Sequence, residues 1–470
     1  MEYMALAEFG MIGLGTMGRN LLLNIAEHNF RVIGYDLDES KRKTLLSEAG
    51  GLEITAADSI SQLLAGLEKP RKIMLLVPAG SIVDKVISEL RPHLENGDTV
   101  IDAGNSHFTD TERRIEELNN TGIEFIGIGI SGGEEGARHG ASIMAGGNPS
   151  IYQQIQPILE SAAAKVDNEP CAAHVGTGSA GHFVKMVHNG IEYGIMQLIA
   201  ETYDLLRRGW QLEPSEIADI FEDWNAGELN SFLMEISVKV LRKKDDETGK
   251  PLVQMILDTA GQKGTGKWTS QAAMDFGVPV PTIDAAVTMR QISALKELRK
   301  QFSETFRRDM SSHHIELHPD SLRKALFGSV IITYAQGFSL IATASEEKEF
   351  GSDLAKIASI WRGGCIIRST FLSEIRRAYT QNYKLKHLLL DKGVAEILNE
   401  TIIHLRKTVS AYNGHGIPSM CFSASLDYFD AIRAERLPAN LIQAQRDFFG
   451  GHTYQRIDRA GTFHTKDWDK

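Results

Sequence analysis

The sequence predicts an α/β domain, a large all-helical domain and a C-terminal tail, on three observations. Short β-type runs alternate with helical patterns up to residue 178, which is typical of a mostly parallel sheet. From Ser179 onward the apolar residues recur with a helical period, and hardly any strand signal remains. After Pro438 the chain is polar and aromatic, with too few apolar residues for a core. We therefore expect domains at 1–178 and 179–437 and a tail at 438–470 that is either disordered or lies on another surface, such as a partner subunit.

The composition excludes several classes of protein. The chain has 470 residues, and its net charge of −11 has the wrong sign for a general nucleic-acid binder. Cys171, Cys365 and Cys421 are odd in number and widely spaced, which fits neither a disulfide framework nor a cysteine zinc site. The N-terminus lacks a targeting pattern, and the apolar stretch 329–344 predicts a buried helix rather than a membrane span. We expect a reduced, cytoplasmic protein.

The expected elements of the α/β domain begin with five short strands. They are Glu8–Ile12, Arg31–Tyr35, Lys72–Val77, Thr99–Ile101 and Glu124–Ile128. In the helical domain, the charged stretch Leu241–Pro251 contains Gly and Pro and predicts a solvated loop between helices.

A glycine fingerprint follows the first strand. Gly13 permits a tight turn, Gly15 lets the backbone approach a pyrophosphate, and Gly18 allows close packing of helix on strand. Asp36 ends the second strand, where a carboxylate accepts hydrogen bonds from both ribose hydroxyls of NAD. This context predicts a Rossmann-like dinucleotide-binding domain rather than a glycine-rich turn without a cofactor.

The residues around Asp36 favour NAD over NADP. Asp36 and Asp38 would both repel a 2′-phosphate, and Leu37 offers no compensating cation. Lys41 and Arg42 follow on the next helix, where such side chains are more often solvated. We therefore expect NAD as the cofactor, with NADP less favoured.

A polar stripe marks the first helix of the second domain. Its residues recur at i, i+3, i+4 and i+7 and are Lys185, His188, Asn189 and Glu192. Their neighbours are apolar, which is not typical of a solvent face. A lysine and a glutamate on a partly buried stripe can have pKa values displaced toward neutrality, as acid/base catalysis requires. The alternative is a buried ion pair beside a histidine on the helix surface.

The helical domain also contains a weak internal repeat. The segment Lys185–Glu201 aligns with Lys324–Leu340 at an offset of 139 residues, and FLMEI downstream matches FLSEI. The alternative is chance similarity between two amphipathic helices. If the repeat is real, its second copy keeps the lysine and replaces the other three polar residues. Packing alone therefore does not demand the polar stripe.

Two glycine-rich segments are further candidates for ligand binding. Ile130–Gly147 is too glycine-rich for simple packed structure, and its backbone at Ser131–Gly133 could approach a ligand. Leu257–Trp268 places Lys263 and Thr265 among glycines, as in an anion-binding loop.

Some isolated cations and histidines are weaker candidates. Arg290 and Arg446 would suit a phosphate or carboxylate clamp, although a single arginine is more often a surface residue. His314 and His318 have a spacing that can hold zinc, but they lack the HExxH order and a third ligand. We expect no metal site.

These motifs together resemble the 6-phosphogluconate dehydrogenase family, the decarboxylating enzymes of the oxidative pentose phosphate pathway. The resemblance covers essentially the whole chain. It rests on GLGTMG (13–18), IDAGNS (101–106), SGGEEGARHG (131–140), KMVHNGIEYG (185–194), LDTAGQKGTGKW (257–268) and LPANLIQAQRDFFGGHTY (437–454).

The resemblance implies oxidation and decarboxylation of 6-phosphogluconate to ribulose 5-phosphate and CO2 by a homodimer that exchanges tails. Lys185 would take the C3 hydroxyl proton and Glu192 would protonate C1, with His188 and Asn189 beside them. The implied substrate contacts are Asn105, Ser131, Gly132, Gly133, Tyr193, Lys263, Thr265 and Arg290, with Arg446 and His452 entering from the other subunit. The implied cofactor contacts are Gly13, Leu14, Gly15, Thr16, Met17, Gly18, Asp36, Val77, Pro78, Ala79 and Asn105.

The sequence departs from the commoner NADP-dependent pattern of that family at two places. Where the pattern reads Asn-Arg-Thr, this chain has Asp36-Leu37-Asp38. Where it commonly reads VKAG, this chain has VPAG at 77–80. Each change removes a cation, so we expect an NAD-preferring member.

Two other functions stay open. A dehydrogenase of small β-hydroxyacids would share the fingerprint and the lysine, but would need neither the helical repeat nor Arg446 and His452. A non-catalytic NAD-binding protein would have no reason to carry Lys185, Asn189 and Glu192 together.

Overall fold

The computed structural model describes residues 5–306 and 315–469, and its N-terminal domain is built on an eight-stranded sheet. The strand order is β10-β7-β6-β5-β4-β1-β2-β3, and every neighbouring pair is parallel except β6 and β7. The strands are β1 Phe9–Ile12, β2 Val32–Tyr35, β3 Ile54–Ala56, β4 Lys72–Leu75, β5 Thr99–Asp102, β6 Glu124–Ser131, β7 Ser142–Ala145 and β10 Ala172–His174. The chain order reverses between β1 and β4, the place where sheets of this type bind ligands.

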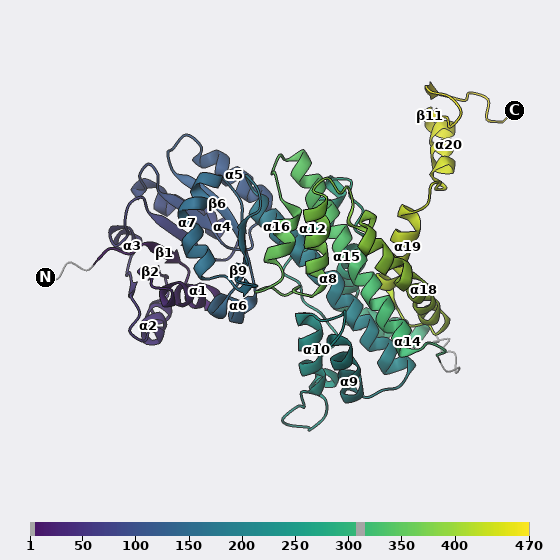
Figure 1. Cartoon of the computed structure of the whole chain (residues 1–470), viewed down its shortest axis with the longest axis horizontal. Coiled ribbons are helices and arrows are strands. Elements are labelled where there is room, and N and C mark those ends of the chain that lie inside the picture. Colours follow the sequence, from purple (N-terminus) through teal and green to yellow (C-terminus); the bar gives the residue numbers. More distant parts are fainter. Residues whose placement is uncertain (1–4, 307–314, 470) are drawn as a thin grey trace.

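Helices cover the sheet (Figure 1), as the alternating pattern predicts. They are α1 Thr16–Glu27, α2 Glu39–Glu48, α3 Ile60–Ala65, α4 Ser81–Leu90, α5 Phe108–Leu118, α6 Gly133–His139 and α7 Pro149–Ser161, with a helical turn η1 at Arg91–His93. The paired strands β8 Lys165–Val166 and β9 Glu169–Pro170 form a small hairpin.

All five predicted strands are confirmed, with ends shifted by a few residues, but β3, β7 and β10 were not foreseen. The expectation that Ile130–Gly147 is too glycine-rich to be packed is wrong, because β7 lies inside it and is fully buried. The glycines there allow close approach: a Cβ on Gly146 would lie 2.5 Å from the backbone nitrogen of Gly181.

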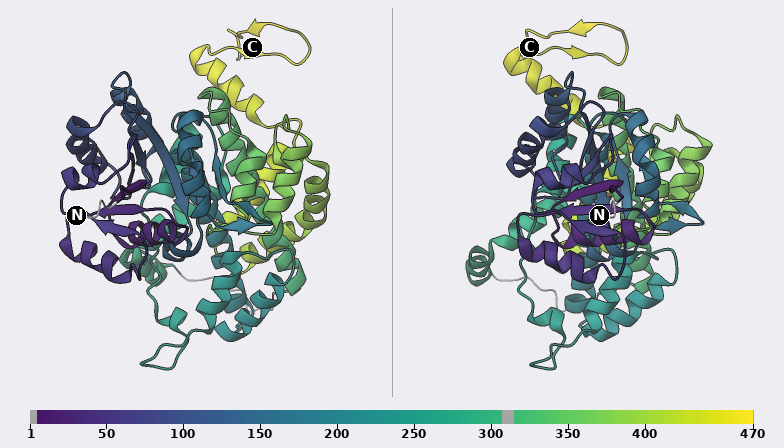
Figure 2. Two further views of the ribbon diagram at one scale, coloured as in Figure 1. Left: turned by 60° about the vertical axis from the view of Figure 1, so that its left-hand side comes forward. Right: turned by 90° about the vertical axis from the view of Figure 1, so that its left-hand side faces the viewer.

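The second domain is helical, as predicted, and its two longest helices cross at its centre (Figures 1 and 2). These are α8 Ala180–Asp204 and α15 Pro319–Glu347. The remaining helices are α9 Pro214–Asn225, α10 Phe232–Arg242, α11 Leu252–Met255, α12 Thr265–Asp275, α13 Pro281–Ala294, α14 Lys296–Thr305, α16 Leu354–Ile360, α17 Phe371–Gln381, α18 Lys392–Gly414 and α19 Met420–Ile432, with turns η2 Leu205–Gly209 and η3 Leu388–Leu390.

The helix α15 contains the apolar stretch 329–344. Of the described helices it alone is long and apolar enough to span a membrane, yet 89% of its most apolar window is buried inside the fold. The prediction of a buried core helix is confirmed. The predicted loop at Leu241–Pro251 is also present, except that α10 continues to Arg242.

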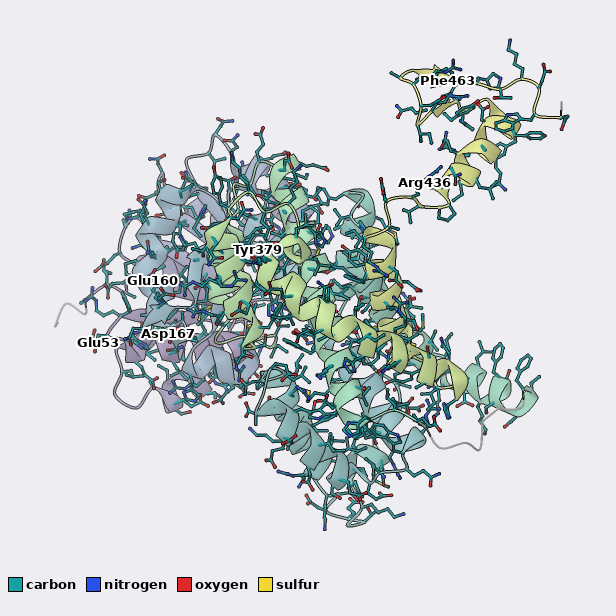
Figure 3. All side chains as sticks on the ribbon, turned by 45° about the vertical axis from the view of Figure 1, so that its right-hand side comes forward. Glu53, Glu160, Asp167, Tyr379, Arg436 and Phe463 are labelled. Atoms are coloured by element: carbon teal, nitrogen blue, oxygen red, sulfur yellow. The ribbon has the colours of Figure 1, made fainter. Side chains whose placement is uncertain are left out.

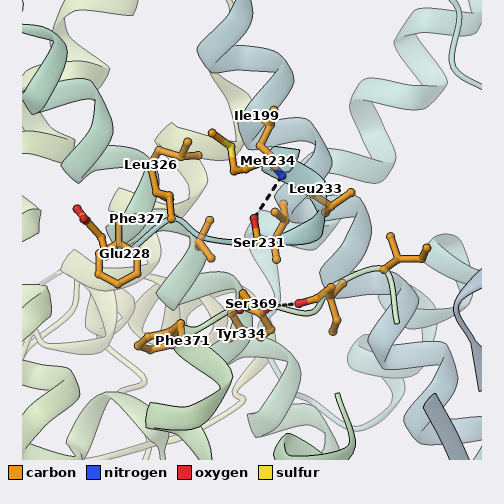
Figure 4. Close-up of a pocket in the computed structure, with 15 residues that line it drawn as sticks. Ile199, Glu228, Ser231, Leu233, Met234, Leu326, Phe327, Tyr334, Ser369 and Phe371 are labelled. Carbon is orange, nitrogen blue, oxygen red and sulfur yellow. Dashed lines mark hydrogen bonds between the residues drawn. The ribbon is translucent and has the colours of Figure 1, made fainter. Parts of the chain in front are cut away.

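The helix boundaries support the internal repeat. At the offset of 139 residues, α8 and α15 both begin (Ala180 and Pro319), as do α10 and α17 (Phe232 and Phe371). The helices α13 and α19 begin at Pro281 and Met420, the same offset again. An apolar pocket lies on the seam between the copies, lined by residues such as Met234 and Phe371 (Figure 4). It contains none of the predicted site residues.

The two copies are interlocked by buried polar side chains. Glu201 of α8 accepts hydrogen bonds from the backbone of Cys421 and Phe422, at the start of α19. Gln336 of α15 accepts one from the backbone of Thr282, at the start of α13. Each long helix therefore caps a helix of the other copy.

The tail extends away from the body (Figures 1 and 3), with Arg436 at its base and Phe463 at its far end. It consists of α20 Ala439–Gly450 and the paired strands β11 Tyr454–Gln455 and β12 Thr462–Phe463. It is neither disordered nor seated on another surface of its own chain. As predicted, it has no apolar core, and a polar one takes its place.

The centre of the tail is the fully buried Asp447. Its carboxylate accepts hydrogen bonds from the backbones of Thr453 and Thr465, the ring of His464 and the indole of Trp468, at 2.9–3.1 Å. Burial raises the pKa of Asp447, but these four donors outweigh it and hold the pKa at about 2. The tail is thus a small folded unit with a polar centre of its own.

Candidate active site

The glycine turn between β1 and α1 is shaped for a dinucleotide. Gly13 has φ +99°, and a Cβ on Gly18 would collide with the carbonyl oxygen of Gly13. A Cβ on Gly15 would meet nothing within 4 Å, so this backbone is open to a ligand. No side chain caps α1, which leaves its N-terminal N–H groups available to phosphates. Leu14 is buried within this turn, while Thr16 and Met17 begin the helix beside it.

Asp36 lies beside this turn, at the end of β2. Its carboxylate accepts hydrogen bonds from the backbone of Leu14 at 2.8 Å and of Asp38 at 3.0 Å. Leu37 is 81% exposed next to it. Arg42 donates to the carbonyl oxygen of Asp36 at 2.6 Å, so this cation is held by local contacts rather than freely solvated.

Two loops continue this edge of the sheet. The loop after β4 exposes Pro78 and Ala79 beside the half-buried Val77, and the loop after β5 exposes Asn105. A buried Arg114 joins the two loops through hydrogen bonds to Gly80, Asp102 and Ser106. Sequence reasoning missed this arginine, because its partners are distant in sequence and no local motif marks it.

The polar stripe of α8 is buried, as predicted. Lys185 is 7% exposed, His188 is fully buried, and Asn189 is 9% exposed, while Glu192 is partly exposed. A Cβ on Gly129 of β6 would collide with Cβ of Lys185, so the strand passes directly beneath the lysine. Alternate glycines in a strand signal such an approach of another backbone, and Gly127-Ile128-Gly129 carried that signal.

The lysine and the glutamate have displaced pKa values. Burial lowers the pKa of Lys185 to about 8, against the opposing effect of the Glu192 charge. Burial raises the pKa of Glu192, against the charges of Lys185 and Arg290. Burial thus favours the uncharged form of both groups and displaces their pKa values toward each other, as expected for a pair of groups that exchange protons.

His188 is neutral and fixed in one tautomer. Burial and the nearby charge of Lys185 hold its pKa well below the usual range. Its Nδ1 lies 3.1 Å from the amide oxygen of Asn189, and its Nε2 lies 3.2 Å from the hydroxyl of Ser131. Because an amide oxygen only accepts, Nδ1 carries the proton and Nε2 accepts from Ser131. Trp361 packs edge-on against the ring at 5.5 Å.

The turn after Ser131 is tightly packed on one side and open on the other. Gly132 has φ +126°, and a Cβ there would lie 2.5 Å from the carbonyl oxygen of Gly364. Gly133 has φ +63° and would place a Cβ in open space. The backbone of Gly133 is therefore accessible to a ligand beside the polar stripe.

Cationic side chains lie next to the Glu192 end of the polar stripe, and we call this group the cationic end. The guanidinium of Arg290 lies 3.5 Å from the ring centre of Tyr193 and donates to the carbonyl oxygen of Gly261. The loop of Gly261 carries the exposed Lys263 and leads into Thr265, the first residue of α12. Predicted residues from three helices and a loop thus meet around Glu192 and Tyr193.

The remaining predicted residues lie elsewhere. Arg446 and His452 are exposed on the extended tail, remote from the stripe of their own chain (Figure 1). His318 caps α15, accepting from the backbone of Asp320, and His314 lies outside the described residues. The described residues contain no group of three or more His, Cys, Asp or Glu placed for a metal, and all three cysteines are buried and free.

Comparison with known proteins agrees with this arrangement. The NAD binding domain of 6-phosphogluconate dehydrogenase matches residues 8–176, and the C-terminal domain of 6-phosphogluconate dehydrogenase matches residues 181–468. The chain is 49% identical to the NADP(+)-dependent, decarboxylating 6-phosphogluconate dehydrogenase of Bacillus subtilis, over 99% of this chain and 100% of that one. It is 48% identical to the decarboxylating 6-phosphogluconate dehydrogenase of Synechococcus elongatus, over 98% and 100%.

A solved structure extends the likeness to three dimensions. The 6-phosphogluconate dehydrogenase of Plasmodium falciparum superimposes with a TM-score of 0.94 at 43% identity, over 98% of this chain and 100% of that one. Its structures include complexes with NADP+ and with 6-phosphogluconate. Since both domains match in order and almost end to end, this chain belongs to the 6-phosphogluconate dehydrogenase family.

Proposed function

We propose that the protein oxidises and decarboxylates 6-phosphogluconate to ribulose 5-phosphate and CO2, using a nicotinamide dinucleotide. The observation that carries this proposal is the buried stripe of α8. There burial lowers the pKa of Lys185 and raises the pKa of Glu192, so the two pKa values are displaced toward each other. The reaction needs one group to accept a proton and another to donate one, which this pair supplies.

The fingerprint turn and its neighbours suit the dinucleotide. The open backbone at Gly15 and the uncapped start of α1 would hold the pyrophosphate, and Asp36 would hold the adenosine ribose. When bound, the oxidised nicotinamide supplies the acceptor for the hydride that leaves C3 of the substrate. The proposed cofactor contacts remain Gly13, Leu14, Gly15, Thr16, Met17, Gly18, Asp36, Val77, Pro78, Ala79 and Asn105.

Lys185 performs two tasks in this proposal. As the neutral amine it takes the proton of the C3 hydroxyl while C3 is oxidised to a ketone. As the resulting ammonium it stabilises negative charge on the C3 oxygen, while the bond from C2 to the carboxylate breaks and CO2 leaves. A pKa of about 8 allows the same side chain to serve in both forms near neutral pH.

Glu192 completes the reaction. Its raised pKa keeps a proton available, and it donates that proton to the carbon from which CO2 has left, which becomes C1 of ribulose 5-phosphate. His188, fixed by Asn189 and Ser131, presents a neutral ring beside the reacting carbons. Its neutrality protects the ammonium of Lys185 from a second adjacent positive charge.

The cationic end is proposed to bind the substrate phosphate. Arg290 is already stacked on Tyr193, which fixes the guanidinium at small entropic cost. The other proposed substrate contacts are Asn105, Ser131, Gly132, Gly133, Lys263 and Thr265.

The tail is proposed to complete the phosphate site of a second copy. Arg446 and His452 are exposed on a folded unit that no other described part of the chain covers, which suits delivery to a partner. Sedimentation of the purified protein should then show a dimer. An active monomer would contradict this part of the proposal.

The activity is tested by mixing the protein with 6-phosphogluconate and either nucleotide. Reduced nucleotide and CO2 should appear in equal amounts. Reduction of the nucleotide without CO2 release would instead indicate a dehydrogenase of another β-hydroxyacid. Binding of nucleotide without any turnover would indicate a non-catalytic binding protein.

We further propose that NAD is preferred to NADP. In support, Asp36 and Asp38 follow the end of β2, where carboxylates would repel a 2′-phosphate, and the exposed Leu37 offers such a phosphate no cation. Arg42 is held by the backbone of Asp36, which reduces its freedom to bind a phosphate. The named Bacillus relative is NADP(+)-dependent, so this chain would differ from it.

The preference is measured as the ratio of kcat/KM for the two nucleotides. The wild type should favour NAD, and the double variant Asp36→Asn, Leu37→Arg should shift the ratio toward NADP. A higher kcat/KM with NADP in the wild type would overturn the preference. The three free cysteines fit the reduced cytoplasm that we propose as its compartment.

A further inference from the structure

Arg114 of α5 makes an unusual set of contacts for a residue outside the proposed site. Its side chain is 1% exposed. Nε donates to the carboxylate of Asp84 at 2.7 Å, and Nη2 donates to the carbonyl oxygen of Gly80 at 3.0 Å. Nη1 donates to the carboxylate of Asp102 at 3.1 Å and to the hydroxyl of Ser106 at 3.3 Å.

These partners belong to two different loops. Gly80 ends the loop after β4, and Asp102 and Ser106 flank the loop after β5. Asp102 itself accepts from the backbone of Gly104 and from the hydroxyl of Ser106. One planar guanidinium thus forms hydrogen bonds to both loops. The second loop also folds around the buried carboxylate of Asp102, which this guanidinium neutralises.

Both loops lie at the sheet edge where the nucleotide is proposed to bind. They follow the adjacent strands β4 and β5, and β4 stands at the reversal of chain order beside β1. Pro78, Ala79 and Asn105 are exposed in these loops and are among the proposed contacts of the cofactor. A shift of one loop relative to the other would change the spacing between these contacts.

A lysine could not replace the arginine here. Lysine keeps the positive charge that the fully buried Asp102 requires, but its single ammonium lacks the fork that reaches Asp84, Gly80 and Asp102 at once. The conservative substitution therefore separates charge compensation from geometry.

We propose that Arg114 is a positioning residue that sets the spacing of the loops at 77–80 and 102–106, and thereby the affinity for the nicotinamide dinucleotide. This inference rests on the dinucleotide binding of the proposed function. It adds a determinant of that binding that contacts neither the ligand nor any residue of the polar stripe.

Arg113 provides a matched control on the same helix. Its guanidinium also binds Asp84, at 2.8 Å, but its other partners are Glu117 and Asp110 of the same helix, and it is 42% exposed. The variants Arg114→Lys, Arg114→Met, Arg113→Lys and Arg113→Met of the full-length protein are titrated with NAD and with NADP by calorimetry, without 6-phosphogluconate. Thermal unfolding and the separate kcat and KM values are measured alongside.

We expect Arg114→Lys to raise Kd for the tighter nucleotide at least about tenfold, with its melting temperature close to wild type, because a small misplacement of the loops weakens binding. Arg114→Met should bind more weakly still. Both Arg113 variants should stay within about twofold of wild type, because exposed ion pairs contribute little. Equal Kd values for Arg114→Lys and Arg113→Lys would overturn the proposal.

A second variant covers the case in which Arg114→Lys does not fold. Ser106→Ala removes the hydrogen bond from Arg114 to the hydroxyl of the second loop. It should raise Kd by a measurable factor that stays below about tenfold. An unchanged Kd in Ser106→Ala would then overturn the proposal, as would a wild type that binds neither nucleotide. Because calorimetry needs no turnover, failure of the proposed reaction would leave this test intact.

Discussion

The two copies within the helical domain share a layout but differ at the four positions of the polar stripe. In α8 the polar stripe is buried beside the sheet, whereas in α15 the matching positions keep the lysine and otherwise hold apolar residues or glycine. The matched pairs are Lys185 and Lys324, His188 and Phe327, Asn189 and Gly328, and Glu192 and Ile331. The second copy packs without a polar stripe, so packing does not explain the first one.

The surroundings of the two lysines explain the difference. Lys185 is buried against Gly129 of β6. Lys324 is 36% exposed and pairs with Asp320 at 3.0 Å. The second copy instead packs against the polar stripe of the first copy. Its Trp361 contacts the ring of His188, and its Gly364 packs against the turn at Gly132. Under the proposed function, the first copy carries the reacting side chains and the second copy forms part of the wall around them.

The largest predicted effect is the difference in kcat between variants of the two lysines. Lys185→Met should lower kcat for 6-phosphogluconate by about a thousandfold or more, because it removes the proposed general base. Lys324→Met should change kcat by less than about twofold, because it removes only an exposed ion pair. Equal loss in both variants, measured as initial rates on folded protein, would break the comparison.

The pH dependence should also follow Lys185. Burial lowers its pKa to about 8, so the neutral amine that accepts the proton becomes scarce below that pH. We expect kcat/KM to fall about tenfold per pH unit below the inflection, as one protonation requires. The profile of Lys324→Met should superimpose on that of the wild type. A flat profile from the inflection down by two pH units would contradict this role.

Adding a methyl group at a close packing contact of each long helix should sharpen the contrast. Gly129→Ala places a Cβ against Lys185, and we expect kcat to fall about ten- to a hundredfold through displacement of the lysine. Gly328→Ala of α15 places a Cβ 2.8 Å from the hydroxyl of Thr401. It should lower the free energy of unfolding by roughly 1–3 kcal/mol and leave kcat nearly unchanged. An unchanged kcat in Gly129→Ala would argue against close seating of the lysine.

The smallest effect on activity concerns the buried cap Glu201, whose predicted contribution is to stability alone. Burial raises the pKa of Glu201 to about 7, above its value of 4.5 as an unperturbed group. The folded protein then binds this proton more tightly than the unfolded chain does, so stability is lost as pH rises from about 4.5 to about 7. The loss from this group is on the order of 3 kcal/mol.

Glu201→Gln should remove that dependence of stability on pH in chemical denaturation, because an amide does not titrate. A glutamine can still accept the capping hydrogen bond, as Gln336 does in the other copy. A slope unchanged by the substitution would exclude Glu201 as its source. The activity at neutral pH should differ little between the variant and the wild type.

The order of an α/β region and a helical region, and the polar stripe, could be predicted because the spacing of apolar and polar residues in short segments indicates both. The stripe needed only the spacing from Lys185 to Glu192, and the fingerprint only its glycines. The strand β7 was missed because its glycines resemble a loop until their close packing is seen. Arg114 was missed because its partners come from two separate loops, and Asp447 because its donors are spread over residues 453 to 468, so no local pattern records either set.

The proposed reaction depends most on Lys185 having a pKa near neutrality in the folded protein. Nuclear magnetic resonance of protein labelled with ¹³C at the lysine ε-carbon measures its titration directly, without substrate or turnover. We predict one lysine signal that titrates near pH 8 and disappears in Lys185→Met but persists in Lys324→Met. If no lysine signal titrates near that pH, or if the signal remains in Lys185→Met, the proposed role of this residue is wrong.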